Sequence, residues 1–192
     1  FIIDDIQAGV GRTDGYFSFE QAGLKPDVIT LAKSLSGYGL PMALTLIRRD
    51  LDIWKPGEHN GTFRGNCHAF VTATAALETF WNGAAFEREI AARSEALRQR
   101  LEIIAARHSD QIERVKGRGM MLGLEMKTGS FAGEVTKQAF LRGLIIEMSG
   151  GDNEVVKCLA FFTIELQQLE EGLNVLADAV EAAIRRARKQ AA

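Results

Sequence analysis

The sequence predicts an α/β protein with a mixed sheet covered by helices, followed by a smaller α+β domain. Continuous apolar runs bounded by loops, at 1–4, 28–32 and 43–48, are typical of strands buried on both faces. Amphipathic helical periodicity covers 86–104 and 166–184, and several short strand-like segments lie between these two stretches. We therefore expect one domain over residues 1–83 and a second over 84–192.

In the first part, the strand at 1–4 ends in Asp4 and precedes a flexible, glycine-rich loop at 8–15. The strand at 28–32 is followed directly by Lys33, which opens a loop of Ser, Gly and Pro residues. After the strand at 43–48, Asn66 is expected to cap a helix that reaches Trp81 and ends near 82–83. Two strands therefore end next to a chemically useful side chain.

In the second part, apolar residues at steps of three, four and seven predict a helix from Phe86 to near His108. Short strands are expected around 113–115, 120–126, 144–147 and 155–160, with a helix over 134–141. The last helix carries one leucine-rich stripe and ends in a basic cluster at 185–189. Cations at the C-terminus of a helix complement the helix dipole, and we prefer this interpretation of the cluster to a nucleic-acid patch.

The composition is that of an ordinary globular protein, with 192 residues, 46% hydrophobic, 25% charged and a net charge of −2. This charge gives no reason to expect nucleic acid or an anionic membrane as partner. Cys67 and Cys158 form no CxxC pattern, so a reducing compartment, the cytoplasm, is expected. No apolar run approaches the roughly 20 residues of a membrane span, and the three histidines are too scattered for a metal site.

The chain opens on Phe1, inside what reads as a buried strand. We therefore expect it to be the C-terminal part of a longer protein, and we expect this segment alone to be inactive and poorly folded.

Three groups in loops or at strand ends indicate a cofactor site. Lys33 supplies an amine, Asp4 a carboxylate, and the Gly61–Thr62 pair a hydroxyl before a helix N-terminus. Pyridoxal phosphate requires three groups of this kind: an amine that forms an imine with its aldehyde, a carboxylate that pairs with its pyridine nitrogen, and a hydrogen-bond donor to its phosphate. Each feature alone has an ordinary explanation: a solvated lysine, a turn-entry acid, a tight capped loop. Strand alternation sends Asp4 and Asp5 to opposite faces, so only one of the two can serve.

Three motifs in order and spacing closely resemble class III (ω-type) aminotransferases: IDDIQAGVGRT (3–13), PDVITLAK (26–33) and GTFRGN (61–66). The resemblance also reaches VKGRGMMLGLE (115–125) and the closing helix. The resemblance covers essentially the whole chain. It implies the C-terminal part of a fold-type I pyridoxal-phosphate-dependent transferase, comprising the end of the large domain and the small C-terminal domain. Within the family, segments 33–42 and 54–62 are most similar to the enzymes that make 2,4-diaminobutyrate for ectoine synthesis.

By this resemblance Lys33 would form the imine with the cofactor and carry a proton at the substrate Cα. Asp4 would pair with the ring nitrogen and Gln7 would approach the phenolic oxygen. Thr62 would bind the phosphate of a neighbouring subunit's cofactor, so the resemblance implies a homodimer or larger assembly with shared sites. The donor would be glutamate and the acceptor aspartate 4-semialdehyde.

The chain departs from the family pattern at several positions. Asp5 replaces the common glutamate, Asp14 the usual glycine, and Lys157 the arginine that grips the substrate carboxylate. Lysine is a point charge and not a planar fork, so Lys157 would bind a carboxylate less directionally. The alternatives are another class III enzyme of the ornithine, acetylornithine or GABA type, a pyridoxal-phosphate aminomutase or racemase, and an inactive fragment.

Overall fold

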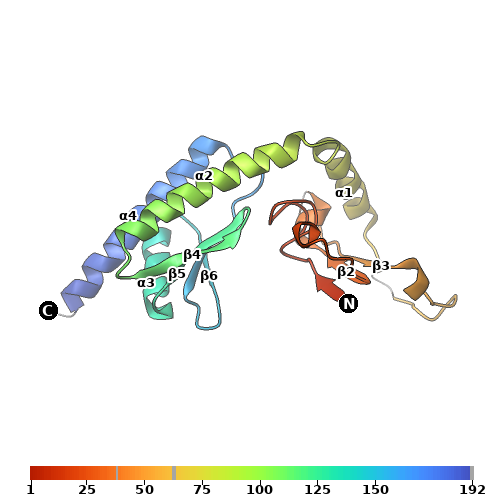
Figure 1. Cartoon of the computed structure of the whole chain (residues 1–192), viewed down its shortest axis with the longest axis horizontal. Coiled ribbons are helices and arrows are strands. Elements are labelled where there is room, and N and C mark those ends of the chain that lie inside the picture. The colour runs from red at the N-terminus through yellow and green to blue at the C-terminus, as the bar shows by residue number, and fades with distance from the viewer. Residues whose placement is uncertain (38, 62–63, 191–192) are drawn as a thin grey trace. The chain divides into compact units, whose positions relative to one another are not determined.

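The computed structural model describes residues 1–37, 39–61 and 64–190, which form two compact units, residues 1–89 and 90–192 (Figure 1). The division falls inside helix α2 (Ala85–Arg107), a few residues beyond the domain boundary expected at 83. Each unit has its own sheet and its own buried side chains.

The sheet of the first unit is mixed, as the sequence predicts. Its strands are β1 (Ile2–Asp4), β2 (Val28–Leu31) and β3 (Leu44–Ile47), in that spatial order. The β1–β2 pair is parallel and the β2–β3 pair is antiparallel. Three short 3₁₀ helices connect these strands to their loops: η1 (Glu20–Ala22), η2 (Lys33–Ser36) and η3 (Arg49–Leu51).

Helix α1 (Cys67–Phe80) confirms the helix predicted after Asn66. The Asn66 side-chain oxygen accepts hydrogen bonds from the backbone N–H groups of His68 and Ala69, at 3.0 and 3.4 Å, as an N-cap does. Helix α1 packs against η2, and a small core of Val10, Leu31 and Leu35 lies beneath the strand ends. This core holds the loops that carry Lys33 and Gln7.

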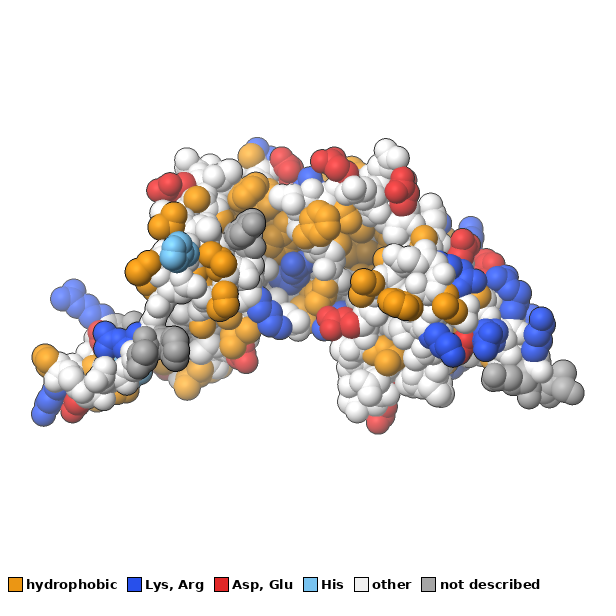
Figure 2. Space-filling model, turned by 180° about the vertical axis from the view of Figure 1, so that it is seen from behind, with side chains coloured by type: hydrophobic (Ala, Val, Ile, Leu, Met, Phe, Trp, Pro, Cys, Tyr) orange, Lys and Arg blue, Asp and Glu red, His pale blue; other side chains and the backbone are white. Residues whose placement is uncertain are grey.

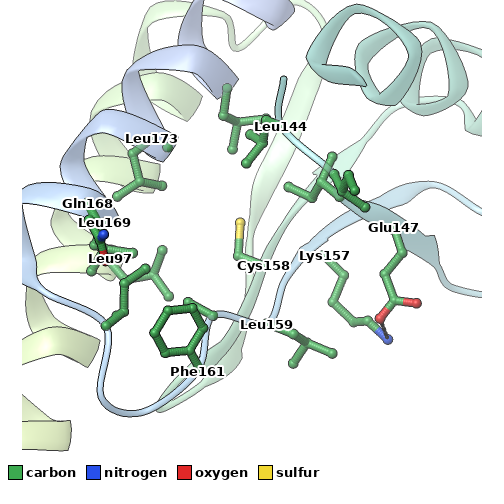
Figure 3. A pocket seen from close by; sticks show the side chains of 16 residues that line it. Leu97, Leu144, Glu147, Lys157, Cys158, Leu159, Phe161, Gln168, Leu169 and Leu173 are labelled. Atoms are coloured by element: carbon green, nitrogen blue, oxygen red, sulfur yellow. Dashed lines mark ion pairs between the residues drawn. The ribbon is translucent and has the colours of Figure 1, made fainter. Parts of the chain in front are cut away.

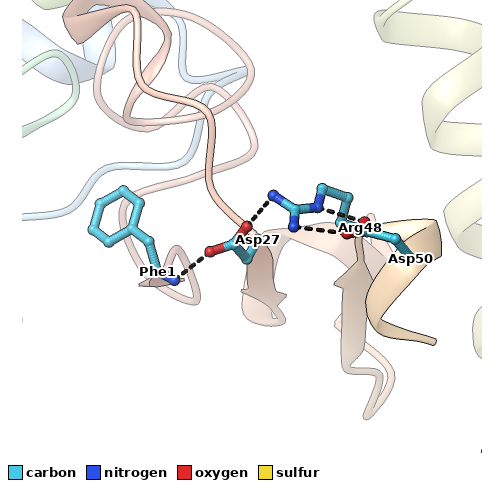
Figure 4. A network of polar contacts seen from close by, with 4 residues as sticks. All are labelled: Phe1, Asp27, Arg48 and Asp50. Carbon is cyan, nitrogen blue, oxygen red and sulfur yellow. Dashed lines mark hydrogen bonds and ion pairs between the residues drawn. The ribbon is translucent and has the colours of Figure 1, made fainter. Parts of the chain in front are cut away.

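A network of ion pairs joins the start of β2 to the end of β3, which are neighbours in the antiparallel pair (Figure 4). The Arg48 guanidinium contacts the carboxylates of Asp27 and Asp50, and Asp27 also accepts a hydrogen bond from the Phe1 α-amine. These contacts lower the pKa of Asp27, chiefly through the α-amine and then through Arg48. Asp27 precedes β2 whereas Lys33 follows it, so the network lies away from the lysine.

The second unit contains a four-stranded antiparallel sheet in the order β4-β5-β7-β6. The strands are β4 (Ile112–Arg118), β5 (Met121–Met126), β6 (Glu147–Ser149) and β7 (Val155–Cys158). Helix α3 (Gly129–Phe140) packs on β5, β6 and β7 and on α4 (Leu166–Gln190). Leu97 and Leu101 of the predicted stripe on α2 and Leu176 of the stripe on α4 are fully buried, whereas Leu166 at the start of α4 is 50% exposed.

Two elements of this unit differ from the prediction. Helix α3 begins at Gly129 and not near Glu134, because the Thr128 hydroxyl caps it by accepting from the Phe131 N–H at 3.2 Å. Strand β6 begins at Glu147, so the apolar residues at 144–146 precede the strand instead of forming it.

Basic side chains gather at the C-terminal end of α4 (Figure 2). Arg186 and Arg185 form ion pairs with Glu134 and Glu181, at 2.9 and 3.3 Å. Within the described residues, no helix combines the length and the apolar character needed to cross a membrane.

Candidate functional site

The parallel pairing of β1 and β2 brings Asp4 and Lys33 to the same edge of the first sheet. Asp4 is the last residue of β1 and lies opposite Thr30 in the register, while Lys33 follows the end of β2. The carboxyl ends of neighbouring parallel strands form the usual position for ligands in α/β sheets. Both side chains are exposed there.

The two adjacent carboxylates have different environments. Asp4 is exposed, and its Oδ1 accepts a hydrogen bond from the Ile6 N–H at 3.1 Å. Asp5 is fully buried on the other face, as the alternation of strand side chains requires. Asp4 is therefore the carboxylate that a ligand at this edge can reach.

Lys33 has an unusual backbone conformation. Its φ is +54°, a left-handed value that non-glycine residues seldom adopt. It opens η2, whose Leu35 and Ser36 are buried and whose C-cap is Gly37 with φ +71°. Strained backbone of this kind persists where the surrounding structure fixes it, often at functional sites.

Gln7 lies three residues beyond the end of β1, in the loop between residues 5 and 18, and is half-buried. The loop is internally bonded: the Gly9 N–H donates to the Asp5 carbonyl at 3.0 Å and the Thr13 hydroxyl to the Ala8 carbonyl at 2.8 Å. Arg12 in this loop is largely buried, and burial lowers its pKa to about 10. Sequence reasoning gave Arg12 no role.

Thr62 lies outside the described residues, so its proposed phosphate contact stays a prediction. The Arg64 guanidinium, after Thr62 in the chain, donates a hydrogen bond to the His59 carbonyl, before Thr62, at 2.8 Å. Asn66 then caps α1. A cavity of about 560 Å³ borders the N-terminus of this helix and is lined by Pro41, Met42, Ala43, Arg64, Gly65, Asn66 and Phe70. Helix N-termini favour anions such as phosphate.

Lys157 belongs to the second unit, on β7. Its ammonium forms an ion pair with Glu147 on β6 at 2.9 Å, and its side chain is 13% exposed. Figure 3 shows Lys157 extending toward Glu147, while the neighbouring Cys158 points into an apolar cavity of about 490 Å³ beside α4. A substrate carboxylate would therefore share Lys157 with Glu147, a partner that sequence reasoning missed.

The donor set at the first sheet edge fits the groups of pyridoxal phosphate. An exposed amine on Lys33 suits the aldehyde, and an exposed carboxylate on Asp4 suits a protonated ring nitrogen. Within the described ranges, no three His, Cys, Asp or Glu side chains gather as a metal site.

Comparison with known proteins extends these observations. The family model for aminotransferase class III matches residues 1–180. The diaminobutyrate–2-oxoglutarate transaminase of Streptomyces avermitilis is 52% identical over 180 residues, which is 93% of this chain and 43% of that protein. The protein of the same name from Vibrio parahaemolyticus is 48% identical over 190 residues, 99% of this chain and 45% of that protein.

Among solved structures, N-acetylornithine aminotransferase from Stenotrophomonas maltophilia matches with a TM-score of 0.81 and 29% identity. The match covers 96% of this chain and 48% of that one. The chain therefore spans less than half the length of these relatives.

Proposed function

The chain belongs to the class III aminotransferase family, and we propose that it is the C-terminal part of a pyridoxal-phosphate-dependent transaminase. The proposed reaction moves the amino group of L-glutamate to L-aspartate 4-semialdehyde, which gives 2-oxoglutarate and L-2,4-diaminobutyrate. The observation that carries the substrate assignment is the identity of about half of all residues with proteins named diaminobutyrate–2-oxoglutarate transaminase. Solved structures of ornithine-type aminotransferases share only 23 to 29% of residues with this chain.

Lys33 and Asp4 have the central roles in this proposal. The Lys33 amine would hold the cofactor, and once free it would be placed to move a proton at the substrate Cα. The Asp4 carboxylate accepts a hydrogen bond from the ring N–H and keeps that nitrogen protonated. When bound, pyridoxal phosphate supplies an electron sink for the carbanion at Cα.

The remaining roles concern binding. Gln7 approaches the phenolic oxygen, Thr62 binds the phosphate, and Lys157 binds a substrate carboxylate. The Lys157 ammonium already forms an ion pair with Glu147, so a substrate carboxylate would share it with that side chain.

We further propose that the full-length protein assembles as a homodimer or larger homo-oligomer, with Thr62 serving the neighbouring subunit's site. We propose that its product, L-2,4-diaminobutyrate, serves ectoine biosynthesis. Both cysteines are free thiols, in keeping with a reducing cytoplasm.

Two measurements on the full-length polypeptide that carries these residues test the proposal. Borohydride reduction with pyridoxal phosphate, followed by peptide mapping, should place the reduced cofactor on Lys33; a label on Lys25 or Lys55 instead would contradict the site. Formation of 2-oxoglutarate from glutamate should require aspartate 4-semialdehyde. Faster turnover with ornithine, N-acetylornithine or 4-aminobutyrate would contradict the substrate assignment, and product formation without any oxo-acid acceptor would indicate an isomerase.

A further inference from the structure

Asp5 is a buried carboxylate that is only half satisfied. Its side chain is 0% exposed, and Oδ2 accepts a hydrogen bond from the Ser18 N–H at 3.1 Å. Oδ1 has no hydrogen-bond partner among the described residues. A buried polar atom without a partner lowers the stability of a fold. Asp5 is therefore poorly explained as a residue that only stabilises the protein.

The bond from Ser18 closes the loop that carries Gln7. Asp5 stands at the first end of the loop and Ser18 at the last, so one carboxylate joins both ends. The Gly9 backbone crosses directly over the same carboxylate: a Cβ at Gly9 would lie 2.5 Å from Asp5 Oδ2. The loop between them is thus held in one closed conformation.

Asp5 also fixes the orientation of Asp4. The Asp5 N–H donates to the Thr30 carbonyl at 3.0 Å, which extends the β1–β2 ladder by one step past Asp4. With the Asp5 side chain anchored inward, strand alternation directs the Asp4 carboxylate outward to the exposed edge.

We propose that Asp5 is a positioning residue for the cofactor: it closes the 5–18 loop over its own carboxylate and thereby sets Gln7 and Asp4 at the sheet edge. This inference rests on the proposed function, because it assigns Gln7 and Asp4 to the cofactor. Asp5 itself touches neither cofactor nor substrate.

The test uses Asp5→Ala and Asp5→Asn in the full-length apoprotein. Titration with pyridoxal phosphate, followed by absorbance, should show about tenfold weaker binding for D5A, the loss of one charge-assisted hydrogen bond. D5N should bind nearly as wild type, because its amide oxygen still accepts from Ser18. In the apoprotein, hydrogen exchange of the Ser18 amide should be faster in D5A than in the wild type and unchanged in D5N.

A double-mutant cycle with Gln7→Ala separates positioning from general destabilisation. If Asp5 acts through Gln7, D5A should weaken cofactor binding little further in the Q7A background. Gly9→Ala keeps Asp5 but places a methyl group against its Oδ2, so it should also weaken cofactor binding. This variant replaces D5A in the test if D5A does not fold. Asp14→Asn, in the same loop, should bind as wild type.

Wild-type cofactor affinity in both D5A and G9A, or losses in D5A that are fully additive with those of both Gln7→Ala and Asp4→Ala, would overturn this inference alone. Failure of the wild-type protein to bind pyridoxal phosphate would overturn the proposed function and this inference with it.

Discussion

The left-handed backbone at Lys33 predicts that glycine is a better substitute there than alanine. An L-residue in the left-handed region costs about 1–2 kcal/mol, which glycine avoids, and φ at Lys33 is +54°. Glycine in turn loses about 0.5–1 kcal/mol more than alanine through the entropy of the unfolded chain. The Lys33 side chain is exposed, so both variants lose the same few contacts. Lys33→Gly should therefore be more stable than Lys33→Ala by about 0.5–1 kcal/mol.

The assay is urea-induced unfolding of the full-length apoprotein, in which no cofactor is attached to wild-type Lys33. Ser34 is the matched control, because it lies in the same 3₁₀ helix and its φ is not positive. There the order should reverse, with Ser34→Ala more stable than Ser34→Gly by about 0.5–1 kcal/mol. Both Lys33 variants should lack transaminase activity. If Lys33→Ala proves at least as stable as Lys33→Gly while Ser34 behaves as expected, the strain argument is refuted.

Three further predictions concern other positions. Burial raises the pKa of the Cys158 thiol to about 12, so native protein at pH 8 should resist alkylation at Cys158 until it is unfolded, as mass spectrometry would show; labelling as fast as in the unfolded chain would contradict this. Gly117→Ala should lower the unfolding midpoint far more than Gly143→Ala, because both have positive φ but only the first Cβ meets backbone, at 2.1 Å from the Met121 oxygen; equal midpoints would show that the hairpin adapts. Asp14 has φ +65°, so Asp14→Gly should raise stability by up to about 1 kcal/mol, and a loss of stability in urea unfolding would refute this.

The sequence was most informative where one local rule decides the structure. Asn66 was predicted as an N-cap and is one, because its short side chain reaches the first free N–H groups of α1. The stripes on α2 and α4 were read correctly because only one face of each helix is buried.

Prediction failed where a glycine or a cavity obscured the pattern. Gly129 and Gly133 weaken the helical signal at the start of α3, and the prediction did not take Thr128 as an N-cap, although threonine is a preferred residue there. The apolar residues at 144–146 resemble a strand, but they line the cavity beside α4 instead of joining the sheet.

For the candidate site, the sequence placed Asp4 and Lys33 at strand ends and indicated that Asp4 and Asp5 face opposite ways. It could not indicate that β1 and β2 are neighbours, since pairing between segments far apart in the chain depends on tertiary packing. For the same reason the Glu147 partner of Lys157 and the Ser18 bond to Asp5 were not foreseen. These contacts join residues that no local spacing rule connects.

Several features that lower stability occur together at one edge of the first sheet. Lys33 and the buried, β-branched Val10 have positive φ, and Asp5 carries the buried oxygen without a partner among the described residues. Each costs on the order of 1–3 kcal/mol. Val10 and Leu35, which follows Lys33, pack into the same small cluster with Leu31, so that cluster holds both strained segments in place. An edge that retains such strain is held in a set geometry before any ligand arrives, as the proposed roles of Lys33 and Asp4 would require.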